Sequence, residues 1–253
     1  MARRVPEGPP PPPVVQRVRL RYARRGRLRF ASHRDFARAF ERALRRAEVP
    51  VAYSAGFTPH PKISYVGAAP TGVASEAEYL EIGLSRRVDV EALRAMIDDA
   101  LPAGLDVADA VEAGPGSLAE RMQAAAWRIE LPGVSPDDAA RAVEAFLAAG
   151  EISVDRLTRD GRRTVDARAP VVSAAVSPGE APRRAILGVV VRLVTPAVRP
   201  DDILAALCVV AGSAFDASRL DYRAVRLAQG PLDDSGAVGD PLANDRSMRE
   251  MSP

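Results

Sequence analysis

The sequence predicts an α+β protein built from two consecutive sandwich domains. Three observations support this prediction: strand-type and helix-type apolar periods alternate along 253 residues, the order β-α-β-β-α-β occurs once, and a similar order then recurs. The outer segments, residues 1–14 and 231–253, are rich in proline or in polar turn formers, and we expect both to be disordered.

The first predicted domain spans residues 15–114. Its first strand alternates apolar residues with arginines over residues 15–25, and Ser32 then caps a helix, with Asp35 three residues later in a capping-box relation. Helix positions from Phe36 to Ala47 repeat at apolar i, i+4 spacing. The remaining elements are strands over 49–56 and 76–85, a helix over 89–102 and a strand over 105–114.

The second predicted domain spans residues 117–230. A strand over 124–132 leads to a helix with Ser135 as N-cap, and an Asp-Gly turn at 160–161 predicts a hairpin between 151–158 and 162–176. The pattern continues with a strand at 183–194, a helix ended by Gly212 and a strand at 216–228. This half has room for one extra strand, and the pair is expected to form two tandem ferredoxin-like sandwiches.

The positive charge is concentrated at the start of the chain. Residues 1–50 contain 14 arginines and four acidic residues, a net charge of +10, whereas the whole chain carries only +2. The predicted strand and helix place arginines on one strand face and on one helix stripe, and guanidinium groups bind phosphate through a planar fork. A polyanion-binding surface is therefore expected, and a solvated face balanced by the acidic remainder is the alternative. The arginines concerned are Arg17, Arg19, Arg21, Arg34, Arg38, Arg42 and Arg45.

The chain has two histidines and one lysine. His33 lies in the first turn of the predicted helix, while His60 stands between two prolines next to Lys62. The prolines hold the His60 backbone extended, which suits either a positioned catalytic or recognition side chain or a packed loop. Tyr53 and Phe57 precede His60, and aromatic residues among cations can stack on unpaired bases.

Other polar and sulfur-containing residues receive structural interpretations. Glu76, Glu78 and Glu81 alternate with apolar residues and are expected on a solvent face, where one of them could pair with a cation. Cys208 and Trp127 have apolar neighbours and are expected in cores.

Several chemistries lack their motifs. The sequence contains no phosphate-binding Gly-rich loop, no H-E-x-x-H and no C-x-x-C, so no cofactor and no metal are expected. A single cysteine excludes an internal disulfide, and the absence of a long apolar run or a secretory leader predicts a cytoplasmic protein without membrane contact.

Three stretches resemble a known family. "RFASHRD" at 29–35, "FERALRRAEVPVAYSAGFTPHPK" at 40–62 and "GVASEAEYLEI" at 72–82 are similar to the radical SAM-linked protein family, a bacterial domain of unknown function. That domain often follows a cobalamin-binding-like and radical SAM region in one chain, and this sequence looks like a stand-alone copy. The resemblance covers about residues 20–85 and implies a role beside RNA-modifying enzymes, in which any radical SAM partner would be a separate polypeptide.

The resulting prediction is a non-catalytic RNA-binding or accessory protein in tRNA or rRNA modification or processing. Two alternatives stay open: a metal-independent RNA-cleaving enzyme that uses His33 or His60, and a module that docks an acidic protein partner. The residues expected to contact RNA are the seven arginines named above together with Tyr53, Phe57, His60 and Lys62.

Overall fold

The computed structural model describes residues 11–158, 161–212 and 221–250, and the chain divides into two compact units. The first unit comprises residues 1–120 and 242–253, and the second comprises residues 121–241. Antiparallel strands combine with helices in both units, which confirms the predicted α+β class. Among the described helices, none is long and apolar enough to cross a membrane.

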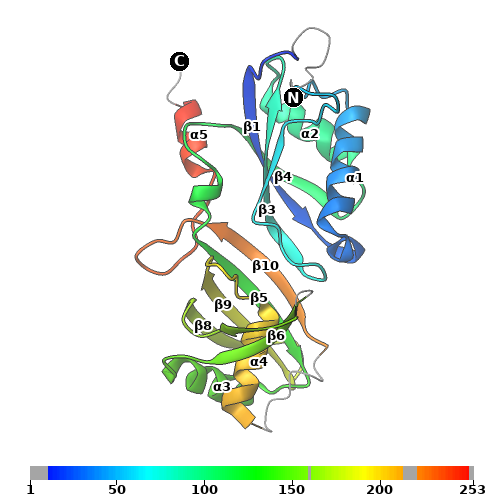
Figure 1. The fold of residues 1–253 in the computed structure, drawn as a ribbon. Helices are drawn as coiled ribbons and strands as arrows, with labels where there is room; N and C mark the ends of the chain where they lie inside the picture. The colour runs from blue at the N-terminus through cyan, green and yellow to red at the C-terminus, as the bar shows by residue number, and fades with distance from the viewer. Residues whose placement is uncertain (1–10, 159–160, 213–220, 251–253) are drawn as a thin grey trace, which may run out of the picture. The chain divides into compact units, whose positions relative to one another are not determined.

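The first unit has the predicted β-α-β-β-α-β order. Strand β1 pairs antiparallel with both β3 and β4, and β2 pairs antiparallel with β3. Helices α1 and α2 cover the same face of these strands (Figure 1) and share one apolar core with them. The elements are β1 (Gln16–Arg24), the 3-10 helix η1 (Gly26–Phe30), α1 (His33–Arg46), β2 (Ile63–Val66), β3 (Ala74–Leu84), α2 (Val90–Ala100), β4 (Leu105–Glu112) and the 3-10 helix η2 (Ala119–Arg121).

The second strand of this unit lies later than the sequence predicts. Residues 49–56 make only two isolated bridges, Val51 with Leu84 and Tyr53 with Pro61, and the strand proper is Ile63–Val66. Pro61 has no backbone N–H to donate, so regular pairing cannot continue through the bridge at Tyr53. The prediction of a strand at 49–56 was therefore wrong, and the His60 loop precedes β2 rather than following it.

The second unit repeats the layout with one insertion. Strand β5 pairs antiparallel with β9 and β10, β9 also pairs with β8, and β6 and β7 form a separate two-stranded sheet. The predicted hairpin and extra strand are thus present, although its Asp-Gly turn includes Asp160, outside the described residues. The elements are β5 (Ala124–Pro132), α3 (Pro136–Ala148), β6 (Ser153–Thr158), β7 (Gly161–Asp166), β8 (Val171–Pro178), β9 (Arg184–Arg192), α4 (Pro200–Ala211) and β10 (Arg223–Gly230).

The helices of the second unit begin and end where the sequence indicates. Ser135 accepts a hydrogen bond from the Asp138 N–H at 3.1 Å, and Gly212 is the C-cap of α4. Trp127 is buried as predicted, whereas Cys208 is only partly buried. Part of the final predicted strand, residues 216–220, lies outside the described residues.

The C-terminal segment departs from the predicted disorder. Helix α5 (Ala243–Glu250) belongs to the first unit, and its Asp245 side chain is completely buried there. Asp245 accepts hydrogen bonds from Arg19 at 2.9 Å and from the Gly114 N–H at 3.0 Å. A buried carboxylate is stable only with such partners. The ion pair with Arg19, which lies 226 residues earlier in the chain, therefore helps to hold α5 in place.

Candidate nucleic-acid interface

Helix α1 begins and packs as its sequence dictates. The Ser32 hydroxyl accepts a hydrogen bond from the Asp35 N–H at 3.2 Å and donates one to the Asp35 carboxylate at 2.6 Å. This hydrogen bond, with help from nearby arginines, lowers the pKa of the Asp35 carboxyl. Phe36, Phe40, Ala43 and Leu44 are buried on the inner face, whereas the arginines of the helix are exposed.

The outer face of α1 is a stripe of arginines without acidic partners. Because all members of this stripe are exposed, they can reach a ligand outside the protein. Within the described ranges, no guanidinium of the stripe lies within 4.0 Å of a carboxylate. Other arginines of the first unit do form such salt bridges. Their mutual repulsion is relieved by solvent, by the nearby Asp35 carboxylate, whose pKa Arg34 and Arg38 help to lower, or by an external anion. The α1 stripe consists of Arg34, Arg38, Arg42 and Arg45.

The arginines of β1 have other roles. Arg19 is only 2% exposed and binds Glu81 at 2.9 Å as well as Asp245, so its charge is already neutralised inside the unit. Arg17 is exposed but also contacts Glu81, at 3.0 Å, and Arg21 is half-buried. The predicted arginine face of β1 is thus mainly an internal ion-pair site, with Arg19 removed from any external ligand.

The nearby acidic residues explain this difference. Glu81, expected on a solvent face, is the acceptor of both Arg17 and Arg19, and Glu76 pairs with Arg25. Glu78 is buried and accepts from the Ala69 N–H at 3.3 Å, which contradicts the predicted solvent position. Arg17 and Arg19 of β1 therefore have ion-pair partners on β3 and on α5, whereas no ion pair of the α1 stripe is found among the described residues.

The loop that carries His60 closes on itself through its backbone. The Ser54 N–H donates to the His60 carbonyl at 2.8 Å, and the His60 N–H donates to the Ser54 hydroxyl at 3.0 Å. Lys62 extends the closure, since its N–H donates to the Ala52 carbonyl at 2.8 Å. The tip is left in solvent, with Phe57 69% exposed and His60 and Lys62 exposed. This loop is therefore held in place while its side chains remain available.

The two histidines have different neighbours. His33 makes an edge contact with the Tyr65 ring, at 4.9 Å between centroids, at the start of α1. Burial raises the pKa of the Tyr65 hydroxyl, and the charge of Glu41 raises it further. His60 instead lines a cavity beside the later turns of α1, and His33 is not among the residues of that cavity. The cavity thus places the His60 loop beside Glu41 and Arg45 of α1.

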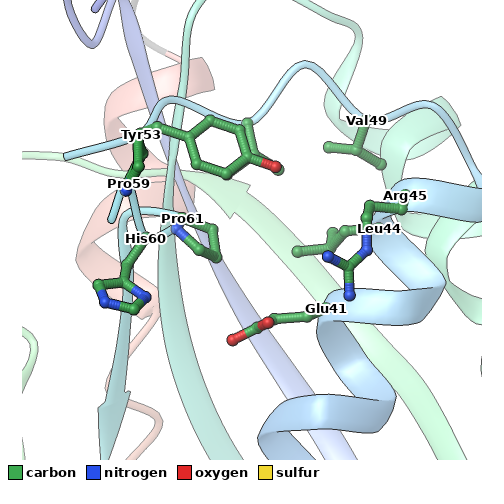
Figure 2. Close-up of a pocket in the computed structure, with 9 residues that line it drawn as sticks. Glu41, Leu44, Arg45, Val49, Tyr53, Pro59, His60 and Pro61 are labelled. Carbon is green, nitrogen blue, oxygen red and sulfur yellow. The ribbon is translucent and has the colours of Figure 1, made fainter. Parts of the chain in front are cut away.

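This cavity joins the loop to the arginine helix. It has a volume of about 250 Å³, and Figure 2 shows the Tyr53 ring extending from the loop side and Glu41 extending its carboxylate from α1 toward the loop. Its apolar surface comes from Leu44, Val49 and Val51. The complete lining is Glu41, Leu44, Arg45, Val49, Val51, Tyr53, Pro59, His60 and Pro61.

Two features of this region were missed from the sequence. Glu41 stands one helical turn before Arg45, a spacing that normally indicates a surface ion pair, yet the two make none. Phe30 is 59% exposed, and the Arg29 guanidinium lies 4.6 Å from its ring centroid, which adds an exposed aromatic–cation pair. Only the packing of the loop against α1 distinguishes Glu41 from any other helix glutamate.

Comparison with known proteins identifies a bacterial family. The family described as "Uncharacterized protein conserved in bacteria (DUF2344)" matches residues 17–200, from β1 to the start of α4. The search of curated proteins returned no match.

Similarity to solved structures is weak. A DypB variant in complex with manganese is 12% identical over 87% of this chain and 92% of its own, with a TM-score of 0.23. DyPB from Rhodococcus jostii RHA1 is also 12% identical, over 86% of this chain and 92% of its own, with a TM-score of 0.22. These scores are too low to indicate a shared fold.

Proposed function

This chain belongs to the bacterial DUF2344 family, and we propose that it is a non-catalytic RNA-binding protein. The observation that supports this proposal most strongly is the α1 stripe, whose four exposed arginines have no ion-pair partner in the described part of the chain. A phosphate backbone supplies the missing anions in a regular row. The stripe extends along about 16 Å of helix, which is the axial length of about five stacked nucleotides.

The exposed loop supports RNA rather than a generic anion. Phe57 and Tyr53 present ring surface next to His60 and Lys62, and Arg45 at the end of the stripe lines the cavity of this loop. Aromatic side chains beside a cationic groove bind single-stranded nucleic acids by stacking on bases while the cations hold phosphates. The proposed interface consists of the α1 stripe and of Tyr53, Phe57, His60 and Lys62.

The finer family context also belongs to the proposal. The resemblance of residues 20–85 to radical SAM-linked proteins suggests that the chain presents RNA to a separate radical SAM enzyme. With Cys208 as its single cysteine, the chain has no three-cysteine cluster motif of its own. The partner is accordingly expected to supply the radical chemistry.

The test compares two sets of arginine substitutions. In the stripe variant, Arg34, Arg38, Arg42 and Arg45 are replaced by glutamine, which keeps a similar helix propensity. Binding of fluorescently labelled tRNA, followed by anisotropy at low salt, is expected to weaken by about tenfold or more, because four phosphate contacts are lost.

The control variant, Arg86→Gln/Arg163→Gln, removes two exposed arginines outside α1 and should bind within about twofold of the wild type. A loss of binding free energy in the control about half as large as that in the stripe variant, in proportion to the arginines removed, would show that only net charge matters. Absence of binding by the wild-type protein would overturn the proposed function itself.

A further inference from the structure

The cavity between α1 and the His60 loop has the dimensions of a single-base site. Its volume of about 250 Å³ is below the roughly 300–1,000 Å³ of pockets that hold drug-sized ligands, and no helical nucleic acid can enter it. Leu44, Val49 and Val51 contribute apolar surface, and the Tyr53 ring and the Pro61 ring flank the space from the loop (Figure 2). Flat ring systems bind between such surfaces by stacking and by burial of apolar area.

The polar groups of the cavity select among flat ligands. Glu41 is its only acidic residue, it is half-buried, and the described residues provide it with no ion pair or hydrogen bond. An ionised carboxylate only accepts hydrogen bonds, so its ligand must present hydrogen-bond donors, and two adjacent donors fit its two oxygens best. Of the four RNA bases, guanine alone carries two adjacent donor groups, N1–H and N2–H, on its Watson–Crick edge.

The surroundings of Glu41 also favour an RNA base over a free cation. Arg45 lines the same cavity and belongs to the α1 stripe, so a strand whose phosphates follow the stripe passes the cavity entrance. A free metal ion would meet only one carboxylate beside a guanidinium, a poor set of ligands. His60 and the Tyr53 hydroxyl, both on the loop, add polar groups that can contact the ribose or the base.

We propose that this cavity binds one unpaired guanine of the RNA, with the Glu41 carboxylate accepting from its Watson–Crick edge and Arg45 holding an adjacent phosphate. The proposal rests on the proposed RNA-binding function and adds a base preference to it. The α1 stripe would then provide sequence-independent affinity, and Glu41 would provide the specificity.

The experiment uses four labelled single-stranded RNA oligomers of uridines, three of which carry one central guanosine, adenosine or cytidine. Anisotropy titrations with the full chain are expected to show about tenfold tighter binding of the guanosine oligomer, within the range for one bidentate base contact. Glu41→Gln should abolish this preference and leave affinity for the all-uridine oligomer within about threefold. Glu144→Gln, which changes an exposed glutamate on α3, should keep the preference.

The possible outcomes separate the two proposals. Equal, salt-sensitive binding of all four oligomers would overturn the guanine site and leave the RNA-binding function standing, and so would a preference for adenosine or cytidine. A guanosine preference that persists in Glu41→Gln would overturn the role given to Glu41. If neither the oligomers nor tRNA bind at low salt, the proposed RNA-binding function is contradicted, and the guanine site with it.

Discussion

Arginines that occur at similar positions of the sequence pattern differ in burial and in ion pairing. Arg19 is enclosed and held by two carboxylates, Arg17 shares one of these carboxylates from the surface, and Arg45 has no acidic partner among the described residues. A buried guanidinium is strongly coupled to its partners, whereas an exposed one is free to bind a ligand. Exposure therefore decides which arginines stabilise the unit and which are available to an external ligand.

Replacement of Arg19 should expose this difference. Arg19→Met removes the guanidinium that pairs with the buried Asp245 carboxylate, and the free energy of unfolding of the first unit is expected to fall by about 3–5 kcal/mol. Arg17→Met is the matched control, because it removes an exposed partner of the same Glu81, and it should cost less than about 1 kcal/mol. Hydrogen exchange of the β1 amides reports the stability of this unit directly.

A second substitution tests the cause of that loss. Adding Asp245→Asn to Arg19→Met removes the buried carboxylate that has lost Arg19 and should recover much of the lost protection. If Arg19→Met and Arg17→Met cost the same, the buried ion pair is not what holds α5 in place.

The sequence predicts the alternation of β1 correctly but not the partners of its arginines. Asp245 lies 226 residues from Arg19, and only the folded chain brings the two together. Local periodicity therefore indicates which side of a strand a residue occupies, and it cannot indicate what covers that side. The same limit explains why Glu41 was missed, since its isolation depends on the loop that packs beside it.

At the scale of elements, local signals fixed the helices better than the strands. Ser32, Ser135 and Gly212 mark helix ends by side-chain or backbone chemistry that acts within a few residues. Strand identity depends on pairing with a distant segment, and residues 49–56 have suitable composition but only isolated bridges. The His60 loop was consequently assigned to the wrong side of β2.

The start of α1 has a testable dependence on pH. Because the Ser32 hydroxyl lowers the pKa of the Asp35 carboxyl in the folded state, the ionised carboxylate stabilises the helix start above the unfolded pKa of about 4. This stabilisation is lost as the pH falls through the lowered pKa that Asp35 has in the folded state. Ser32→Ala removes the donor, so its thermal stability should depend less on pH between about 3 and 5 than that of the wild type.

Circular dichroism melts at a series of pH values measure this effect. Ser32→Thr keeps a capping hydroxyl and should follow the wild-type curve. If the melting temperatures of the wild type and of Ser32→Ala change with pH in the same way, the pKa of the Asp35 carboxyl does not depend on the Ser32 hydroxyl.

At the scale of the whole molecule, a near-neutral chain carries a localised cationic surface. Residues 1–50 contain 14 arginines. Among the described residues, arginines of β1 form ion pairs with carboxylates from later in the chain, and those of α1 do not. The first unit also receives both ends of the described chain, since α5 belongs to it. Composition alone predicted a basic surface near the N-terminus, and the fold shows that the arginines of α1 are exposed while Arg19 of β1 is buried in ion pairs.

The most direct test of this account is the salt dependence of RNA binding. For the wild-type chain and an all-uridine oligomer, the logarithm of the association constant plotted against the logarithm of salt concentration should have a slope of about −3, from four phosphates at about −0.7 each. The stripe variant should lose most of this slope, and Arg86→Gln/Arg163→Gln should keep it. A slope that is unchanged in the stripe variant, or binding that does not respond to salt, would contradict the assignment of α1 as the RNA-binding surface.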